Sequence, residues 1–197
     1  MKLTVPTILT LMRILLIPVL VLVFYLPWKW TNFAAAFVFV LASVTDWLDG
    51  WIARRYDQSS AFGAFLDPVA DKLMVAVALL LIVQKHPTPW MAFWAAVIIG
   101  REIAVSALRE WMAELGQRAR VKVATIGKIK TIVQMVALAF LLYFEPLVLR
   151  LGGQAVTVPV FTIGEWLLAA AALLTLWSGL AYLHAAWPTL REDSRNS

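Results

Sequence analysis

Long apolar stretches separated by short polar segments dominate the sequence. Six of them approach or exceed the roughly 20 residues that a helix needs to cross a hydrocarbon core, namely residues 7–26, 31–54, 64–85, 89–112, 126–144 and 160–187. Strands of a membrane barrel would instead alternate apolar and polar residues. The pattern therefore predicts an all-α polytopic membrane protein with six transmembrane helices. It leaves a single domain over residues 1–197, with a connection at 145–159 and a polar tail from residue 191.

Composition supports this assignment and excludes several kinds of site. The chain is 62% apolar, well above the 45–50% of soluble domains. It has no cysteine, which excludes disulfides, thiolate catalysis and cysteine-ligated metals. The two histidines, His86 and His184, lie near the ends of apolar stretches, where interfacial positions are expected rather than zinc ligation. The net charge of +5 comes from basic loops, as in membrane proteins, so no nucleic-acid partner is expected.

The basic residues predict the orientation in the membrane. One side of the six stretches carries most of them, namely Lys2, Arg54, Arg55, Arg118, Arg120, Lys122, Lys128, Arg191 and Arg195. The other side has only Lys29, Lys85 and Arg150. Because basic loops stay in the cytoplasm, both termini are predicted to be cytoplasmic. Arg13 inside the first stretch, and the lack of a small-residue cleavage site, indicate a retained helix rather than a signal peptide.

Four carboxylates lie at matching depths on the second and third stretches. Asp46 and Asp49 are three residues apart, and Asp67 and Asp71 are four apart, so each pair shares a helix face. At 1.5 Å per residue, Asp46 lies about 22 Å from the start of its helix. Asp67 and Asp71 fall in the first turns of the next helix. Both pairs are therefore expected at one level, in a polar cavity that faces the cytoplasm.

Such a cluster in a membrane protein predicts a function. The carboxylates would repel each other in a low-dielectric site unless cations neutralise them, and Mg²⁺ or Mn²⁺ prefer oxygen ligands. One ion or a close pair would fit, and such ions commonly clamp phosphates. Two other interpretations remain open. The acids could cap helices or pair with Arg54, Arg55 or Lys72, or they could form an ion or proton pathway.

Small residues and an arginine follow the first carboxylate pair. Gly50 leaves room for a ligand on the face of Asp46, Ala53 is also small, and the Arg54 guanidinium suits bidentate phosphate contact. Together with the acids they favour a diphosphate substrate. Gly63 is expected to form the turn into the third stretch.

These residues carry a resemblance to a known family. The run D-x2-D-G-x2-A-R-x8-G-x3-D-x3-D extends from Asp46 to Asp71 without departure, and it resembles the signature of the CDP-alcohol phosphatidyltransferases. The resemblance extends across nearly the whole chain. The segments PTILTLMR, TDWLDGWIARR, FGAFLDPVADK, REIAVSALREWMAELG and IGKIKT resemble bacterial members in particular.

The resemblance implies an expected site and reaction. It implies a homodimer in the bacterial cytoplasmic (inner) membrane, with the active site in a cytoplasm-facing cavity. Two divalent ions would be held by Asp46, Asp49, Asp67 and Asp71, and Asp71 would also be the general base. The CDP-diacylglycerol site would be formed by Gly50, Ala53, Arg54 and Gly63. The expected reaction is CDP-diacylglycerol plus sn-glycerol 3-phosphate giving phosphatidylglycerophosphate and CMP.

A phosphorylated acceptor would also need a basic pocket on the fourth and fifth stretches. The candidates are Arg101, Arg109, Lys128 and Lys130. The two lysines could instead be anchors of the cytoplasmic side, and Arg101 could pair with Glu102 or an aspartate. Serine, inositol phosphate or phosphatidylglycerol are the other acceptors to consider. A cation or proton-coupled transporter and a structural membrane subunit are the alternatives from other classes.

Overall fold

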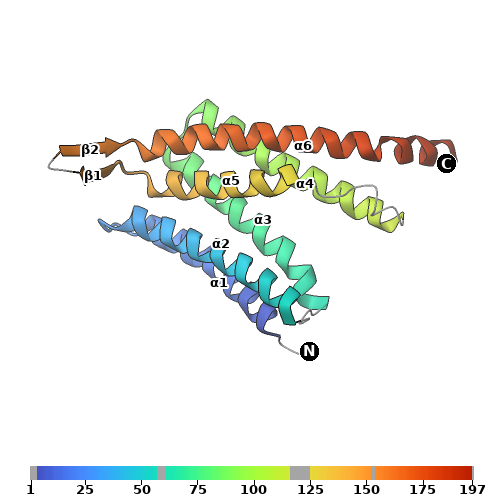
Figure 1. Ribbon diagram of the computed structural model, residues 1–197, viewed down its shortest axis with the longest axis horizontal. Coiled ribbons are helices and arrows are strands. Elements are labelled where there is room, and N and C mark those ends of the chain that lie inside the picture. Colours follow the sequence, from blue (N-terminus) through green and yellow to red (C-terminus); the bar gives the residue numbers. More distant parts are fainter. Residues whose placement is uncertain (1–3, 57–60, 116–124, 152–153, 197) are drawn as a thin grey trace.

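The structure is a computed structural model that describes residues 4–56, 61–115, 125–151 and 154–196. Within these ranges, nothing is assigned to the side chains of residues 53, 54, 56, 61, 64, 125–128, 149–151, 154 and 188–196. The described chain forms six helices and one two-stranded hairpin (Figure 1). The predicted all-α class is confirmed in its helices, and the hairpin is an addition to it.

Each predicted apolar stretch forms one helix. The helices are α1 (Val5–Tyr25), α2 (Thr31–Tyr56), α3 (Ala61–Lys85), α4 (Pro89–Glu114), α5 (Thr125–Tyr143) and α6 (Val160–Asn196). In the described residues, four segments are long and apolar enough to cross a membrane, in α1, α2, α4 and α6. α5 contributes a shorter apolar helix, Ile129–Tyr143. α3 is similar in length, but it is not among these four, and it carries the charged residues Asp67, Asp71, Lys72 and Lys85.

Three details differ from the sequence prediction. The connection after α5 is an antiparallel hairpin of β1 (Leu147–Leu151) and β2 (Gln154–Val158). The predicted tail beyond residue 191 is helical to Asn196, because polar composition ends a membrane span without ending a helix. Gly63 lies inside the first turn of α3 rather than in the turn before it.

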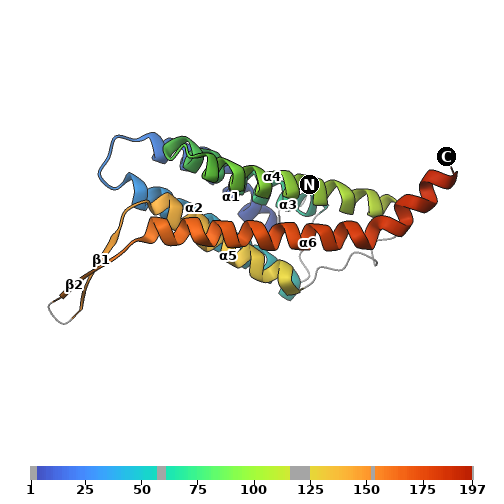
Figure 2. The same ribbon diagram turned by 90° about the horizontal axis from the view of Figure 1, so that it is seen from above.

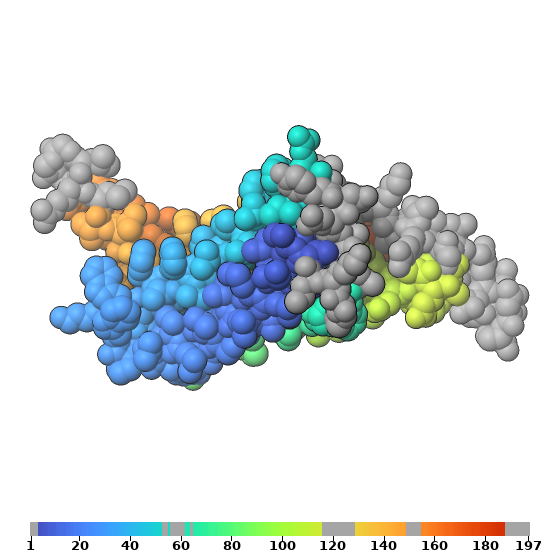
Figure 3. All heavy atoms as spheres, turned by 90° about the horizontal axis from the view of Figure 1, so that it is seen from below, coloured from blue at the N-terminus to red at the C-terminus, as the bar shows by residue number. Residues whose placement is uncertain are grey.

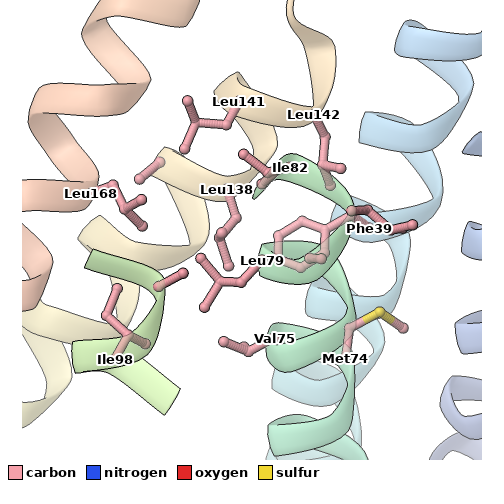
Figure 4. Close-up of a cluster of buried hydrophobic side chains, with 14 of the residues drawn as sticks. Phe39, Met74, Val75, Leu79, Ile82, Ile98, Leu138, Leu141, Leu142 and Leu168 are labelled. Atoms are coloured by element: carbon pink, nitrogen blue, oxygen red, sulfur yellow. The ribbon is translucent and has the colours of Figure 1, made fainter. Parts of the chain in front are cut away.

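α3 lies at the centre of the molecule. α1 packs along α2 and α5 along α6, while α3 crosses between these pairs and contacts α1, α4 and α5 (Figures 1 and 2). The main core surrounds the second half of α3, where Leu79 and Ile82 meet Phe39 of α2, Ile98 of α4 and Leu138 of α5 (Figure 4). The polar first half of α3, with the two aspartates, lies beyond this core.

The ends of the molecule and its surface agree with a membrane protein. The hairpin lies at one end of the long axis and the C-terminal end of α6 at the other, with the start of α1 between them (Figures 1 and 2). Figure 3 shows α1 and α2 side by side on one face, in blue. Many outward side chains are large and apolar, including Leu22 at 68%, Leu80 at 62% and Leu180 at 65% exposed. A soluble protein rarely exposes so many large apolar side chains, which indicates that lipid covers them.

Gly164 sets the approach of α6 to α5 and gives a first test of this packing. A Cβ at Gly164 would lie 3.0 Å from Leu141 Cγ and 3.1 Å from Phe140 Cβ. Gly164→Ala is therefore expected to destabilise the protein by about 1–3 kcal/mol through overpacking. Gly100→Ala is the matched control because its Cβ would meet nothing within 4 Å, so better helix propensity should stabilise it by about 0.5–1 kcal/mol. Thermal unfolding in detergent measures both, and equal midpoints would contradict this close packing.

Candidate active site

Polar side chains on the first half of α1 form one wall of the site. Thr7, Thr10 and Arg13 follow each other at three-residue intervals, so they share one face of the helix. All three are buried, with Arg13 only 1% exposed. Pro6 lies in the first turn of α1, where its missing N–H costs nothing. This polar stripe lies in an otherwise apolar helix and faces the carboxylates of α2 and α3.

The Arg13 guanidinium joins α1 to both carboxylate-bearing helices. Its Nη1 lies 2.9 Å from Oδ1 of Asp46 and also contacts Oδ1 of Asp71. Its Nη2 contacts Oδ2 of Asp49. Because Asp46 and Asp71 share one nitrogen, these two carboxylates from different helices lie next to each other. The convergence that the sequence spacing predicts is therefore present for three of the four acids, around a basic residue that the prediction did not place there.

The fourth acid, Asp67, is held separately by α1. The Thr10 hydroxyl donates to Oδ1 of Asp67 and also lies 3.0 Å from the carbonyl oxygen of Pro6. Thr10 and Arg13 are one turn apart on α1, as Asp67 and Asp71 are on α3. The two helices thus meet through two matched polar contacts, which bring all four acids to one end of the bundle.

The described partners of the acids bear on one sequence interpretation, in which the acids pair with Arg54, Arg55 or Lys72. Lys72 donates to Ser106 of α4 rather than to an aspartate, and Arg55 is exposed. The side chain of Arg54 lies outside the described residues. In each described ion pair of these acids, the positive charge comes from Arg13. Asp49 is buried at 4% exposure, whereas Asp46 and Asp71 are each 39% exposed, so the latter two can reach a substrate.

Comparison with known proteins identifies the family. Residues 3–177 match the CDP-alcohol phosphatidyltransferase family. The chain belongs to this family. It is 53% identical over 186 residues to the CDP-diacylglycerol--glycerol-3-phosphate 3-phosphatidyltransferase of Escherichia coli K12, which covers 94% of this chain and 96% of that protein. The protein of the same name from Shigella flexneri serotype 5b is 54% identical over the same shares of the two chains.

The residues predicted to bind the cytidine nucleotide are placed only in part. Gly50 is half-buried on α2, one turn after Asp46, and Gly63 is buried in α3. Ala53 and Arg54 follow Gly50 on α2, but their side chains lie outside the described residues. The backbone therefore puts all four predicted residues on the two helices that carry the aspartates, and their contacts with a nucleotide stay a prediction.

The basic residues of α4 and α5 have partners that the sequence could not specify. Lys130 is buried, and its Nζ lies 2.8 Å from Oε1 of Glu102. Arg101 donates to the carbonyl oxygen of Thr175 (3.1 Å) and to Oγ of Ser178 (2.7 Å), both on α6. These contacts tie α4 to its neighbours.

The other two predicted acceptor residues have no described ion pair. Arg109 is exposed on α4. Lys128 lies in the first turn of α5, and its side chain is outside the described residues. Among the four predicted acceptor residues, Arg109 is therefore the one whose described side chain is exposed at the surface.

An apolar groove leads away from the aspartates. It has a volume of about 410 Å³ and runs between α2 and α5, lined by side chains that include Phe39, Val44, Ile132 and Val136. Asp46 lies in the lining of the same groove. The groove therefore connects the polar end of the site with the apolar side of the bundle, which is the arrangement that an amphipathic substrate requires.

Thr10 and Arg13 are the site residues that sequence reasoning missed. Neither residue belongs to the run from Asp46 to Asp71 that carries the family signature. A signal was present, because isolated polar residues spaced three apart in an apolar span mark a helix face that must meet polar partners. The spacing of Thr7, Thr10 and Arg13 could have identified α1 as part of the site.

Proposed function

We propose that the protein transfers the phosphatidyl group from CDP-diacylglycerol to sn-glycerol 3-phosphate, giving phosphatidylglycerophosphate and CMP in phospholipid biosynthesis. One observation carries this proposal. The aspartates of α2 and α3 converge at one end of the bundle, within a chain that is 53% identical, over almost its full length, to a phosphatidyltransferase of this specificity. The same similarity favours a transferase over a cation or proton-coupled transporter.

The oxygen donors of the site suit divalent cations by type, although among the described residues no three acids are grouped closely enough to hold an ion. The four carboxylates exceed the single guanidinium of Arg13 by three negative charges, so the cluster requires further positive charge. Its ligands are oxygen atoms of Asp46, Asp49, Asp67 and Asp71, which suit Mg²⁺ or Mn²⁺. Two such ions, when bound, would neutralise the diphosphate of CDP-diacylglycerol and the charge on departing CMP.

Binding of the lipid nucleotide uses both polar and apolar parts of the site. The nucleotide lies against Gly50, Ala53, Arg54 and Gly63, where small residues permit close approach and the guanidinium of Arg54 suits a phosphate. An acyl chain of the same molecule fits the groove between α2 and α5, which begins at Asp46. This placement puts the diphosphate beside the aspartates and leaves the hydrocarbon on the lipid side.

The transfer itself requires a base and a leaving group. The primary hydroxyl of the acceptor attacks the phosphorus that carries diacylglycerol, and its proton goes to the Asp71 carboxylate. The bond from this phosphorus to the bridging oxygen breaks, and CMP leaves with that bond's electron pair. Asp71 suits the role because it is part-exposed and lies beside Asp46 at the mouth of the cluster. The buried Asp49 is less accessible to an acceptor.

The acceptor phosphate binds basic residues of α4 and α5. Arg101, Arg109, Lys128 and Lys130 are the candidates. Support comes from α4 and α5, which carry these residues at the polar end of the bundle. Lys72, next to Asp71, hydrogen-bonds Ser106 of α4 and so links the carboxylate helix to this basic region.

The proposal extends to how the protein lies in the membrane. All six helices cross the membrane, with α3 and α5 completing the four clearly apolar spans. Both termini and the active site, in a polar cavity, face the cytoplasm, on the side where lysine and arginine concentrate. The protein lies in the inner membrane of a bacterium, as a single domain and as a homodimer.

The choice of acceptor is tested directly by competition. Purified protein receives CDP-diacylglycerol, Mg²⁺ and equal concentrations of glycerol 3-phosphate, serine, inositol phosphate and phosphatidylglycerol, and mass spectrometry identifies the lipid products. Phosphatidylglycerophosphate is expected as the dominant product, because the 53% identical relative is named for glycerol 3-phosphate and because a basic pocket binds a phosphate dianion better than zwitterionic serine. A dominant product from another acceptor would keep the transferase chemistry but overturn the assigned acceptor.

A further inference from the structure

Arg13 lies at the centre of the carboxylate cluster and has no role in the proposed reaction. Its side chain is 1% exposed, although arginine is almost never buried unless it is paired. The three carboxylates that it contacts come from two other helices. A buried charge at a junction of three helices is costly in a membrane protein, and it therefore calls for a specific function.

The guanidinium uses the oxygen atoms that a divalent cation would need. Nη1 contacts both Asp46 and Asp71, and Nη2 contacts Asp49. These are three of the four proposed cation ligands. A guanidinium in contact with these oxygens places a positive charge within a few ångströms of any cation that they would hold, and the two positive charges repel each other strongly in a low-dielectric site. Arginine and divalent cations are thus in competition for these positions.

The pairing is also incomplete, unlike that of a purely structural ion pair. Asp67 is held by Thr10 rather than by Arg13. Arg13 Nε is buried and has no hydrogen-bond partner among the described residues. A buried unsatisfied donor is destabilising, so the guanidinium is not in an arrangement optimised for stability alone. It retains a donor for another acceptor when its carboxylates are taken by cations.

We propose that Arg13 is an internal counter-ion that competes with divalent cations for Asp46, Asp49 and Asp71 and thereby sets the cation affinity of the site. It is a positioning residue, because it holds the carboxylates of α2 and α3 together before cations bind. Cation binding moves the guanidinium away from these oxygens. This inference rests on the cation ligands of the proposed function, but not on the identity of the acceptor.

The test measures Mn²⁺ binding rather than turnover. The detergent-purified full chain is stripped with a chelator and titrated with Mn²⁺, with free Mn²⁺ measured by electron paramagnetic resonance. Arg13→Met should bind Mn²⁺ about tenfold or more tightly than the unchanged protein, because a neighbouring positive charge is removed from a low-dielectric site. In chelator, the same variant should unfold at a lower temperature, because the carboxylates then repel each other.

Two further variants make the result specific. Lys85→Met removes a positive charge from the other end of α3, where Lys85 contacts Asn32 and the Phe144 ring, and it should leave Mn²⁺ affinity unchanged. Arg13→Lys keeps the charge but cannot span three carboxylates with one point charge, so its Mn²⁺ affinity should lie between those of the unchanged protein and Arg13→Met. If Arg13→Met cannot be purified, the lysine variant still decides, since weaker binding than the unchanged protein would overturn the proposal.

The outcomes separate this inference from the proposed function. Equal or weaker Mn²⁺ binding by Arg13→Met would show that Arg13 only supports the fold or the ligands, and would overturn competition. Mn²⁺ binding that is unchanged in a double variant carrying Asp46→Asn together with Asp71→Asn would overturn the proposed ligands themselves. Tighter binding by Arg13→Met in a protein that makes no lipid product would support the inference and contradict only the proposed function.

Discussion

Asp71→Asn is expected to lower turnover by about a thousandfold, within the range that a general base contributes. The amide keeps nearly the size of the carboxylate but cannot accept the proton of the acceptor hydroxyl. It still offers an oxygen to Nη1 of Arg13, which Asp71 contacts in the structure. The measurement is the initial rate of CMP release from CDP-diacylglycerol at saturating acceptor, with the affinity for CDP-diacylglycerol determined in parallel.

The rate of CMP release should fall far more than the affinity for CDP-diacylglycerol. Affinity for the lipid nucleotide is expected to change only a few-fold, because Asp46, Asp49 and Asp67 remain as cation ligands. Glu110→Gln is the matched control: it makes the same carboxylate-to-amide change at an exposed position of α4 and should retain full activity. An Asp71→Asn variant with more than a small fraction of the normal rate would remove Asp71 from the role of base.

Glu102→Ala is expected to destabilise the protein by about 2–3 kcal/mol. The change leaves Lys130, only 4% exposed, with a positive charge that has lost its carboxylate. The value lies below the full cost of breaking a deeply buried pair because Glu102 is itself 27% exposed. Thermal unfolding in detergent measures the loss, with Glu110→Ala as a control for removal of an exposed carboxylate from the same helix.

A double replacement tests whether the two charges act as a pair. Glu102→Ala combined with Lys130→Met removes both charges, so the double variant should unfold at a higher temperature than Glu102→Ala alone. If the second change lowers the unfolding temperature further, Lys130 contributes through something other than its contact with Glu102. The same variants also bear on the proposed acceptor site. If Lys130 binds the acceptor phosphate, its amino group must be able to leave Glu102.

The helices could be predicted from the sequence because their signal is strong and local. An apolar stretch of about 20 residues has few stable alternatives to a helix, and the start of α2 at Thr31 and of α4 at Pro89 coincide with the predicted residues. The hairpin of β1 and β2 was missed although the sequence contains its signal: Gly152 and Gly153 separate two five-residue runs, LVLRL and QAVTV, which is the spacing of a two-residue hairpin turn. The extension of α6 was missed because hydropathy indicates membrane spans rather than helix ends.

The site was predictable where its residues lie close together in the sequence. Asp46 and Asp49 share a turn of one helix, Asp67 and Asp71 share a turn of the next, and a short connection fixes their common level. Arg13 lies far from these aspartates in the sequence. It is separated from Asp49 by 36 residues and from Asp71 by 58. Contacts at such separation depend on how helices pack, and spacing along one helix does not contain that information.

The central claim is that this chain carries out phosphatidyl transfer to glycerol 3-phosphate. The most direct measurement supplies purified protein with CDP-diacylglycerol, Mg²⁺ and labelled glycerol 3-phosphate, and follows CMP and labelled lipid together. The account predicts equal amounts of CMP and labelled phosphatidylglycerophosphate, with both lost when a chelator replaces Mg²⁺. Release of CMP without labelled lipid, or no release of CMP at all, would contradict it.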